Sequence, residues 1–380
     1  MVAGRVEVDF GEMERLSWHP SRKRDAGRSG ILGHCPPMWN RIGDNRTQVG
    51  NRPWSAIVPA SVAVIIVNFN SGALLAECLR HLQAQTRRPE RVIVVDNASQ
   101  DGSADRSAAE YPGVALVRMA QNIGFAAANN LAARQAGEVE WLALLNPDAF
   151  PEPEWLERLL QAGSAYPDCA SFGSRMVDAS DPHRLDGTGD IYHVSGLAWR
   201  RDHGQPASSG GREAGEIFAP CAAAALYRRA VFCEIGGFDE DYFCYFEDVD
   251  VGFRLQLRGH RCRYAPDAVV RHVGSALTGR RSAFSVYHGH RNLVWTWCKN
   301  MPGPLFWRYL PQHLLLNLID VVWFVLRGQG RVILRAKWDA LRGLPRCWRK
   351  RAIVQSQRRV SPWGLRELMR GGLLALYRRG

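Results

Sequence analysis

The stretch WLALLNPD, residues 141–148, decides how the fold is interpreted. An apolar run ends abruptly at Asn146, Pro147 and Asp148, which is typical of a buried strand that presents a carboxylate at its carboxyl end. In open α/β sheets the ligand crevice lies outside those strand ends, so an acid there is well placed to hold a metal. A plain turn is the alternative, because Pro presets φ while Asn and Asp hydrogen-bond to their own backbone.

Three apolar runs upstream repeat this pattern. VAVIIV (62–67), RVIVV (91–95) and VALV (114–117) each lead into a polar loop, and helical periodicity follows the first and the third. Strands that alternate with helices imply parallel βαβ units. We therefore predict an α/β domain with a mostly parallel sheet that is flanked by helices.

Polar side chains follow all four predicted strands. They are Asn68, Asn70, Asp96, Asn122, Asn129, Asn146 and Asp148. Because parallel strands end at the same edge of a sheet, we expect these side chains to converge on one nucleotide-binding crevice.

Two glycine-rich phosphate cradles are missing from the sequence. There is no G-x-G-x-x-G after the first strand and no G-x-x-x-x-G-K-[ST], which disfavours a dinucleotide oxidoreductase and a P-loop phosphotransferase. The charge of a bound diphosphate must then be met in another way. We expect Mg²⁺ or Mn²⁺ on Asp148, because such a cation keeps waters and takes its other ligands from substrate phosphates.

A second acidic cluster lies in YFEDVDVGF (245–253). Glu247, Asp248 and Asp250 would lie in the first turn of a helix that starts near Glu247, where the helix dipole favours negative charge. Simple N-terminal capping is the alternative to a functional role. Further along, the strand-like segment DAVVRHVGS (267–275) carries His272, whose role depends on whether it reaches the same crevice.

The stretch between these motifs is less regular. Residues 165–215 contain many glycines, and we predict short strands and a mobile loop there. An apolar strand is expected at Ala222 to Tyr227, followed by a short helix that ends at Gly236 and Gly237.

Together these motifs resemble family 2 glycosyltransferases with the GT-A fold, in particular the rhamnosyltransferase-like branch that modifies bacterial cell-surface polysaccharides and lipid-linked oligosaccharides. The matching segments occur in order between about residues 61 and 300. They are VAVIIVNFNS (62–71), VVDNASQDGS (94–103), QNIGFAAANN (121–130), LLNPDA (144–149), GGFDEDYFCYFEDVDVGFRLQLRG (236–259) and PDAVVRHVGS (266–275).

The resemblance implies a role for each matching position. Asp148 would be the metal-binding acid of the family's D-x-D position, and His272 would complete the metal site. Asp248 would be the general base, with Glu247 as a positioning residue. The donor nucleotide would be bound by Asn68, Asn70, Asp96, Asn122, Asn129 and Asn146.

Two positions depart from the family pattern. Asn146 replaces the first acid of D-x-D, although this branch commonly carries the same N-P-D. Cys221 stands where a glycine is common before the Ala-rich strand, which affects the acceptor side.

The implied reaction is an inverting transfer of a sugar from a nucleoside-diphosphate donor to a hydroxyl of a surface polysaccharide or lipid-linked oligosaccharide. By resemblance the donor would be dTDP-rhamnose. The alternatives are the same fold with a UDP- or GDP-sugar, and a catalytically silent sugar-nucleotide-binding scaffold. A scaffold would need none of the acids named above, so their presence favours an enzyme.

Composition divides the 380 residues into three parts. Residues 1–60 are rich in Arg, Gly, Pro and Asn, and we predict a disordered basic extension, or a misassigned start with Met38 as the true one. Residues 61–300 would form the catalytic domain. The chain does not start with a signal peptide pattern, and its nine cysteines lack any C-x-x-C pair, so we expect reduced thiols in a cytosolic protein.

The third part, residues 301–380, is both apolar and basic. LFWRYLPQHLLLNLIDVVWFVLRG (305–328) has too many polar interruptions for a good spanning helix, so a helix lying in the membrane plane fits better. The net charge of the chain is +12, and only two acids lie beyond Arg327, against fourteen basic residues that could meet anionic lipid. This predicts attachment to the cytoplasmic face of the inner membrane, or a cytoplasmic protein.

The third part of the chain has two other interpretations. A helical subdomain that packs onto the catalytic core is the alternative to membrane attachment. Nucleic acid is not an expected partner, because the basic run borders an apolar helix and contains no recognised binding motif.

Overall fold

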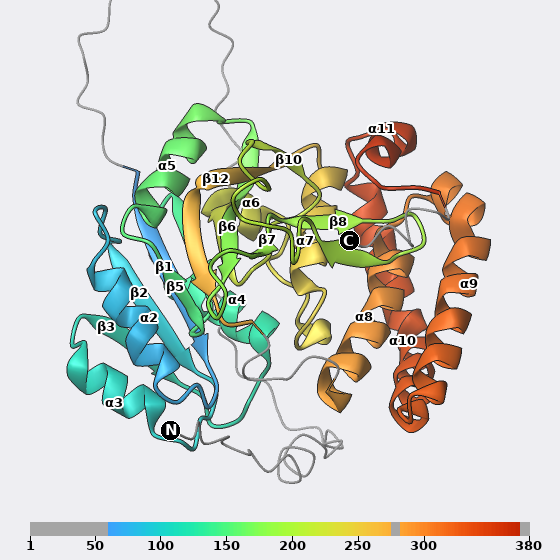
Figure 1. Cartoon of the computed structure of the whole chain (residues 1–380). Coiled ribbons are helices and arrows are strands. Elements are labelled where there is room, and N and C mark those ends of the chain that lie inside the picture. The colour runs from blue at the N-terminus through green and yellow to red at the C-terminus, as the bar shows by residue number, and fades with distance from the viewer. Residues whose placement is uncertain (1–59, 275–281, 373–380) are drawn as a thin grey trace, which may run out of the picture. The chain divides into compact units, whose positions relative to one another are not determined.

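The computed structural model describes residues 60–274 and 282–372 (Figure 1). Val58–Gly380 forms one compact unit, and the extension predicted at residues 1–60 lies outside the described residues except for Ala60. The strands are β1 (Val62–Asn68), β2 (Arg91–Asp96), β3 (Val114–Arg118), β4 (Trp141–Leu145), β5 (Ala149–Pro151), β6 (Cys169–Asp178), β7 (Leu185–Gly187), β8 (Asp190–Tyr192), β9 (Ala198–Arg200), β10 (Gly215–Ile217), β11 (Ala224–Arg228) and β12 (Arg261–His272). The helices are α2 (Leu74–Gln83), α3 (Ser103–Glu110), α4 (Phe125–Gln135), α5 (Trp155–Ala165), α6 (Arg229–Glu234), the 3-10 helix η1 (Glu240–Tyr242), α7 (Glu247–Leu257), α8 (Ala283–Asn300), α9 (Gly303–Leu326), α10 (Gly330–Ser356) and α11 (Pro362–Glu367).

The central sheet has the strand order β10-β12-β6-β11-β4-β1-β2-β3. Strands β1 to β4 pair in parallel, as predicted from the four apolar runs. In the register of this sheet Asn68 pairs with Asp96, and Ile65 pairs with Leu144, so the polar loops after these strands lie at one edge. Strand β11 is antiparallel to both β4 and β6, which makes the sheet mixed.

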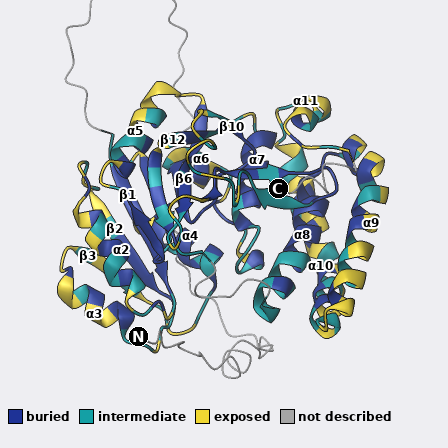
Figure 2. Ribbon diagram, viewed as in Figure 1, coloured by how far each residue is buried: buried dark blue, intermediate teal, exposed yellow. Residues whose placement is uncertain are grey.

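Burial explains why strands β1 and β4 are continuous apolar runs. Every residue of β1 and β4 is buried, because helices cover both faces of the parallel part of the sheet (Figure 2). Helix α2 contributes one face at the spacing expected from the sequence. Its buried residues are Leu75, Cys78, Leu79 and Leu82.

The prediction of short strands at residues 165–215 is wrong at its start. Cys169–Asp178 forms the ten-residue strand β6, which lies between β12 and β11 inside the sheet. Its sequence CASFGSRMVD mixes small and polar residues, so it lacks the apolar run by which the other strands were found. A tertiary contact satisfies Ser174, since the indole Nε1 of Trp155 donates to Ser174 Oγ at 2.8 Å. Short strands β7 to β10 follow, as expected.

The carboxyl-terminal helices have one packed face and one exposed face. Helix α10 packs along α8, and α9 continues as a helix through Pro311. Within the described residues, α9 is the one helix long and apolar enough to cross a membrane by length and composition, and only 11% of its most apolar window is buried. One side of these helices packs onto the rest of the protein, as the alternative of a helical subdomain predicts. The other side is exposed to solvent (Figure 2).

Candidate active site

The loop after β4 does form a turn, and that turn also brings a carboxylate to the sheet edge. The Ala149 amide donates to Asn146 O at 3.1 Å, while the Asn146 amide donates to Ala223 O of the neighbouring strand region at 2.8 Å. The short strand β5 then pairs with the end of β12, with Ala149 opposite His272. This pairing brings the buried Asp148 next to His272, with 3.4 Å between Asp148 Oδ1 and His272 Nε2.

A second carboxylate orients the imidazole. His272 Nδ1 lies 2.7 Å from Asp186 Oδ2, and Asp186 also forms an ion pair with Arg200. Burial of His272 opposes its protonation, but the carboxylates of Asp148 and Asp186 outweigh this effect and raise the pKa of His272 to about 9. Burial would raise the pKa of Asp186, yet the bond to His272 and the charge of Arg200 lower it to about 2.

The donor set fits a divalent cation that is shared with a diphosphate. His272 Nε2 is buried and has no hydrogen-bond partner, although it faces Asp148. Within residues 60–274 and 282–372 no group of three or more His, Cys, Asp or Glu side chains could hold a metal ion. Asp148 and His272 would be a pair of ligands. Mg²⁺ or Mn²⁺ bound in this way takes its other ligands from phosphate and water. Metal binding would require loss of the proton on Nε2, and the bond from Nδ1 to Asp186 would then hold the tautomer in which Nε2 can bind the metal.

The acidic cluster at Glu247 begins a helix, as expected. The residue before α7 is Phe246, which is in the left-handed region with φ 68° and makes no side-chain cap, so none of the acids occupies the N-cap position. Asp248 Oδ2 accepts from the Ala222 amide at 3.1 Å, and its Oδ1 accepts from the Val249 amide at 2.8 Å. The next residue after Ala222 accepts the bond from Asn146, so Asp248 reaches the same sheet edge as Asp148.

Electrostatics separate the two acids of this pair. Burial raises the pKa of both Glu247 and Asp248, and their mutual repulsion raises that of Glu247 further. Two backbone amides and the charge of Arg200 counteract this rise at Asp248, while Glu247 Oε2 is buried without a hydrogen-bond partner. The pKa of Glu247 is thus raised well above its usual value, while hydrogen bonds and Arg200 oppose the rise at Asp248.

The polar residues at the ends of β1 and β2 form a connected network. The Asn68 amide donates to Asp96 Oδ1 at 3.0 Å and to the hydroxyl oxygens of Ser99 and Ser103. In the loop above them, Asn70 Oδ1 accepts from the Gln100 amide at 2.8 Å. These three predicted donor-binding residues, Asn68, Asn70 and Asp96, are thus brought together.

The other predicted donor-binding residues are held separately. Asn122 Oδ1 accepts from Asn97 Nδ2 at 2.8 Å, which links the third loop to the second. Asn129 is buried, and its amide donates to Phe125 O within α4 at 2.9 Å, so that donor is satisfied by its own helix. Asn146 lies in the turn before Asp148, beside the metal candidates.

Three charged residues of the site were missed in the sequence. Asp186 and Asp190 lie on β7 and β8, and Arg200 pairs opposite Asp190 on β9. Asp190 is buried, and its pKa is raised well above the usual value by burial and by the nearby charge of Asp248. The sequence signal that could have indicated these acids is LDGTGD (185–190), in which Asp186 and Asp190 flank two glycines. It lies in the segment 165–215, for which the sequence predicts short strands and a loop.

Comparisons with known proteins relate the sequence of this chain to glycosyltransferases. The model of Glycosyl transferase family 2 matches residues 63–236, and that of Glycosyl transferase family group 2 matches residues 192–328. The chain is similar to the N-acetylglucosaminyl-diphospho-decaprenol L-rhamnosyltransferase of Mycobacterium tuberculosis, with 31% identity over 257 residues that cover 60% of this chain and 81% of that protein. It is also similar to the O-antigen chain rhamnosyltransferase RfbN of Salmonella typhimurium, with 24% identity over 56% of this chain and 66% of that protein.

A solved structure shares the fold. The crystal structure of GalNAc-T7 with UDP, GalNAc and Mn²⁺ has a TM-score of 0.53 and 16% sequence identity, and the match covers 63% of this chain and 48% of that chain. At this identity the likeness concerns the fold alone. The predicted GT-A architecture, a mostly parallel sheet flanked by helices with a helical carboxyl-terminal region, is confirmed.

Proposed function

The chain belongs to glycosyl transferase family 2, and on that premise we propose that it transfers a sugar, with inversion, from a nucleoside-diphosphate donor to a hydroxyl of a lipid-linked or cell-surface glycan. The observation that carries the proposal is the convergence of Asp148, His272 and Asp248 on one sheet edge. These residues lie more than 100 positions apart in sequence at the extremes, so only the fold unites them.

The proposed chemistry is a single displacement. Asp248 accepts the proton of the acceptor hydroxyl as the new glycosidic bond forms, and Glu247 positions that carboxylate. Burial of Asp248 supports this role, because it raises the pKa of the carboxyl and makes it a stronger base. One base on one side of the sugar leads to inversion without a covalent sugar–enzyme intermediate.

Asp148 and His272 are the residues that would hold Mg²⁺ or Mn²⁺. When bound, the cation would offset the negative charge that develops on the leaving nucleoside diphosphate. Asp186 keeps His272 in the orientation that such binding needs. The network of Asn68 and Asp96 at the ends of β1 and β2 would bind the base and ribose of the donor.

We propose dTDP-rhamnose as the donor, because two of the relatives are named as rhamnosyltransferases. There are two alternatives. In the first, the same fold uses a UDP- or GDP-sugar as the donor in place of dTDP-rhamnose, and in the second, the chain is a catalytically silent scaffold that binds sugar nucleotides. A donor screen that measures released nucleoside diphosphate, with Mg²⁺ and Mn²⁺ and a GlcNAc-diphosphoprenol acceptor, tests all three. We expect acceptor-dependent release from dTDP-rhamnose; release from another donor changes the sugar, and no release from any donor contradicts the enzyme.

The exposed face of the carboxyl-terminal helices supports attachment to an anionic membrane. Large apolar side chains on α9 and α10 are open to solvent. They are Trp307, Leu314, Leu315, Leu318, Ile319, Val322, Trp323, Val325 and Leu326 on α9, and Leu334, Trp338, Leu341, Trp348 and Ile353 on α10. Exposed arginines of α10 accompany them, namely Arg331, Arg335, Arg342, Arg346 and Arg349. An apolar face bordered by cations is typical of a helix that lies in the interface of an anionic bilayer. The protein would then act at the cytoplasmic face of the inner membrane.

A triple variant of the full chain tests this attachment. Leu314→Gln, Leu318→Gln and Val322→Gln together should lower binding to vesicles of phosphatidylglycerol and phosphatidylcholine by about tenfold or more, because apolar area is no longer transferred out of water. Co-sedimentation measures the bound fraction. Tyr166→Gln, which changes an exposed apolar side chain beyond α5, is the matched control and should bind like the wild type. Equal binding of the triple variant and the wild type would contradict membrane attachment through α9.

A further inference from the structure

The general-base candidate Asp248 follows a backbone segment whose conformation is intrinsically unfavourable and needs support from other parts of the protein. We call residues 239–246, which lead directly into α7, the entry loop. Phe243, Tyr245 and Phe246 in this loop have φ values of 66°, 68° and 68°. Side chains with a Cβ adopt this region at an energetic cost, so the conformation persists only where the surroundings hold it.

Helix α8 supplies the hydrogen bonds that hold the entry loop. Asn292 Nδ2 lies within donating distance of three carbonyl oxygens, those of Tyr242 (3.0 Å), Cys244 (2.9 Å) and Tyr245 (2.7 Å). Asn292 is completely buried, so no water replaces these bonds. The neighbouring Arg291 donates through Nη2 to the carbonyl of Tyr242 at 2.9 Å and to that of Asp241 at 3.2 Å.

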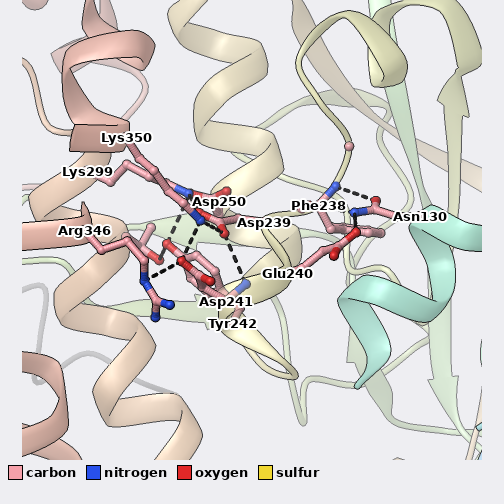
Figure 3. Close-up of polar contacts among 12 residues, drawn as sticks. Asn130, Phe238, Asp239, Glu240, Asp241, Tyr242, Asp250, Lys299, Arg346 and Lys350 are labelled. Carbon is pink, nitrogen blue, oxygen red and sulfur yellow. Dashed lines mark hydrogen bonds and ion pairs between the residues drawn. The ribbon is translucent and has the colours of Figure 1, made fainter. Parts of the chain in front are cut away.

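Charge pairs hold the start of the entry loop and the first turn of α7 that follows it (Figure 3). Lys299 of α8 lies between two carboxylates, 2.6 Å from Asp239 Oδ2 and 2.8 Å from Asp250 Oδ1. Lys350 of α10 also pairs with Asp239 and, at 2.6 Å, with Asp241. Asp250 is the third acid of the predicted cluster, and its partners show that it anchors α7 and does not face the crevice.

The entry loop also touches the donor side of the site. The Ala126 amide at the start of α4 donates to Phe243 O at 3.2 Å. Asn130 of α4 bonds both backbone groups of Phe238, just before the loop (Figure 3). A displacement of this loop would therefore move Asp248 relative to the donor.

We propose that Asn292, assisted by Arg291, is a positioning residue for the general base, and that α8 is part of the active site although none of its residues needs to touch the substrate. The proposal rests on the proposed function. The amide of Asn292 fixes the last turn of the entry loop, and the loop fixes the first turn of α7, which carries Glu247 and Asp248.

The test compares isosteric substitutions in the full-length protein. Asn292→Leu removes the donors and keeps the number and branching of the side-chain heavy atoms, and Asn292→Asp places an acceptor against three carbonyls. We expect kcat to fall by about 10²-fold for Asn292→Leu, the effect of a misplacement of about 1 Å, and further for Asn292→Asp. The donor Kd with Mn²⁺ should stay within about twofold in both, with kcat normalised to the donor sites counted by calorimetry.

A second measurement does not depend on activity. Hydrogen exchange of the peptide amides at 242–249 should be faster in Asn292→Leu than in the wild type, with exchange of β1 and β4 unchanged. Cys298→Ala is the matched control, since it shortens a buried side chain of the same helix and leaves the hydrogen bonds of Asn292 and Arg291 to the entry loop in place. It should leave both kcat and exchange at 242–249 as in the wild type.

The outcomes separate this proposal from the proposed function. A folded Asn292→Leu protein with kcat within about threefold of the wild type, or with unchanged exchange at 242–249, overturns the positioning role. If both Asn292 variants fail to fold, Arg291→Lys decides on the same two criteria, because it keeps the charge but loses the planar donor pair. A wild type that transfers no sugar from any donor removes the proposed function, while the exchange experiment still decides whether α8 holds the loop.

Discussion

Replacing Asp248 by Asn should lower the rate of sugar transfer by about 10²–10⁴-fold, the usual contribution of a positioned general base. Asparagine has nearly the same shape, and its carbonyl oxygen can still accept one of the two backbone amide bonds that Asp248 receives from Ala222 and Val249. The side chain loses its basicity but keeps its place. Donor affinity should therefore change little, and calorimetric titration with the donor and Mn²⁺, next to initial rates of transfer, measures both quantities.

Glu247→Gln is the informative comparison for this variant. Glu247 lies next to Asp248 in the first turn of α7 and is buried, whereas Asp248 is half-buried, and a positioning residue should cost less in kcat than the base itself. Full transfer activity in Asp248→Asn would remove Asp248 from the role of base. If Glu247→Gln then showed the larger loss, the two roles would have to be exchanged.

Replacing Asp148 by Ala should abolish the metal-dependent part of donor binding. In the wild type, His272 Nε2 and Asp148 Oδ1 are 3.4 Å apart, and both would hold the cation. The variant removes the carboxylate, so His272 alone would remain to bind the metal. We expect the donor Kd of the variant to equal that of the wild type in EDTA. Titration of the donor with and without Mn²⁺ measures the difference directly.

Asp186 provides a graded control for the metal site. Asp186→Asn keeps both metal ligands but weakens the bond that orients His272, so Mn²⁺ affinity should fall by about 10–100-fold without being lost. Wild-type donor affinity that does not respond to EDTA, or an Asp148→Ala protein with undiminished Mn²⁺-dependent binding, would contradict the metal assignment.

The parallel half of the fold could be predicted because its information is local. Strands β1, β2, β3 and β4 are short apolar runs that stop at polar loops. Burial on both faces explains the runs of β1, β4 and most of β2, while β3 at the edge of the sheet has no buried residue. Parallel pairing then places the ends of these strands at one edge, so Asn68 and Asp96 could be expected to meet. The same reasoning, with the family resemblance, led to Asp148, His272 and Asp248.

The remainder could not be predicted because it depends on contacts between distant segments. Strand β6 is buried between β12 and β11 without an apolar run, and its Ser174 is paired with Trp155 of α5, a contact that the local sequence does not show. Asp186 acquires its role from His272, 86 positions later. In the sequence Asp250 is indistinguishable from Asp248, and only Lys299 and Arg254 mark it as an anchor of α7.

The ion pairs of Lys350 with Asp239 and Asp241 have a practical consequence for building chimeric enzymes. Exchange of residues 301–380 between relatives would separate Lys350 from the acids at residues 239 and 241. A hybrid that crosses over at residue 300 thus needs compatible partners on both sides of the seam. Crossing over before Phe238 would transplant the acids together with the lysines, and such a hybrid should retain its own matched set.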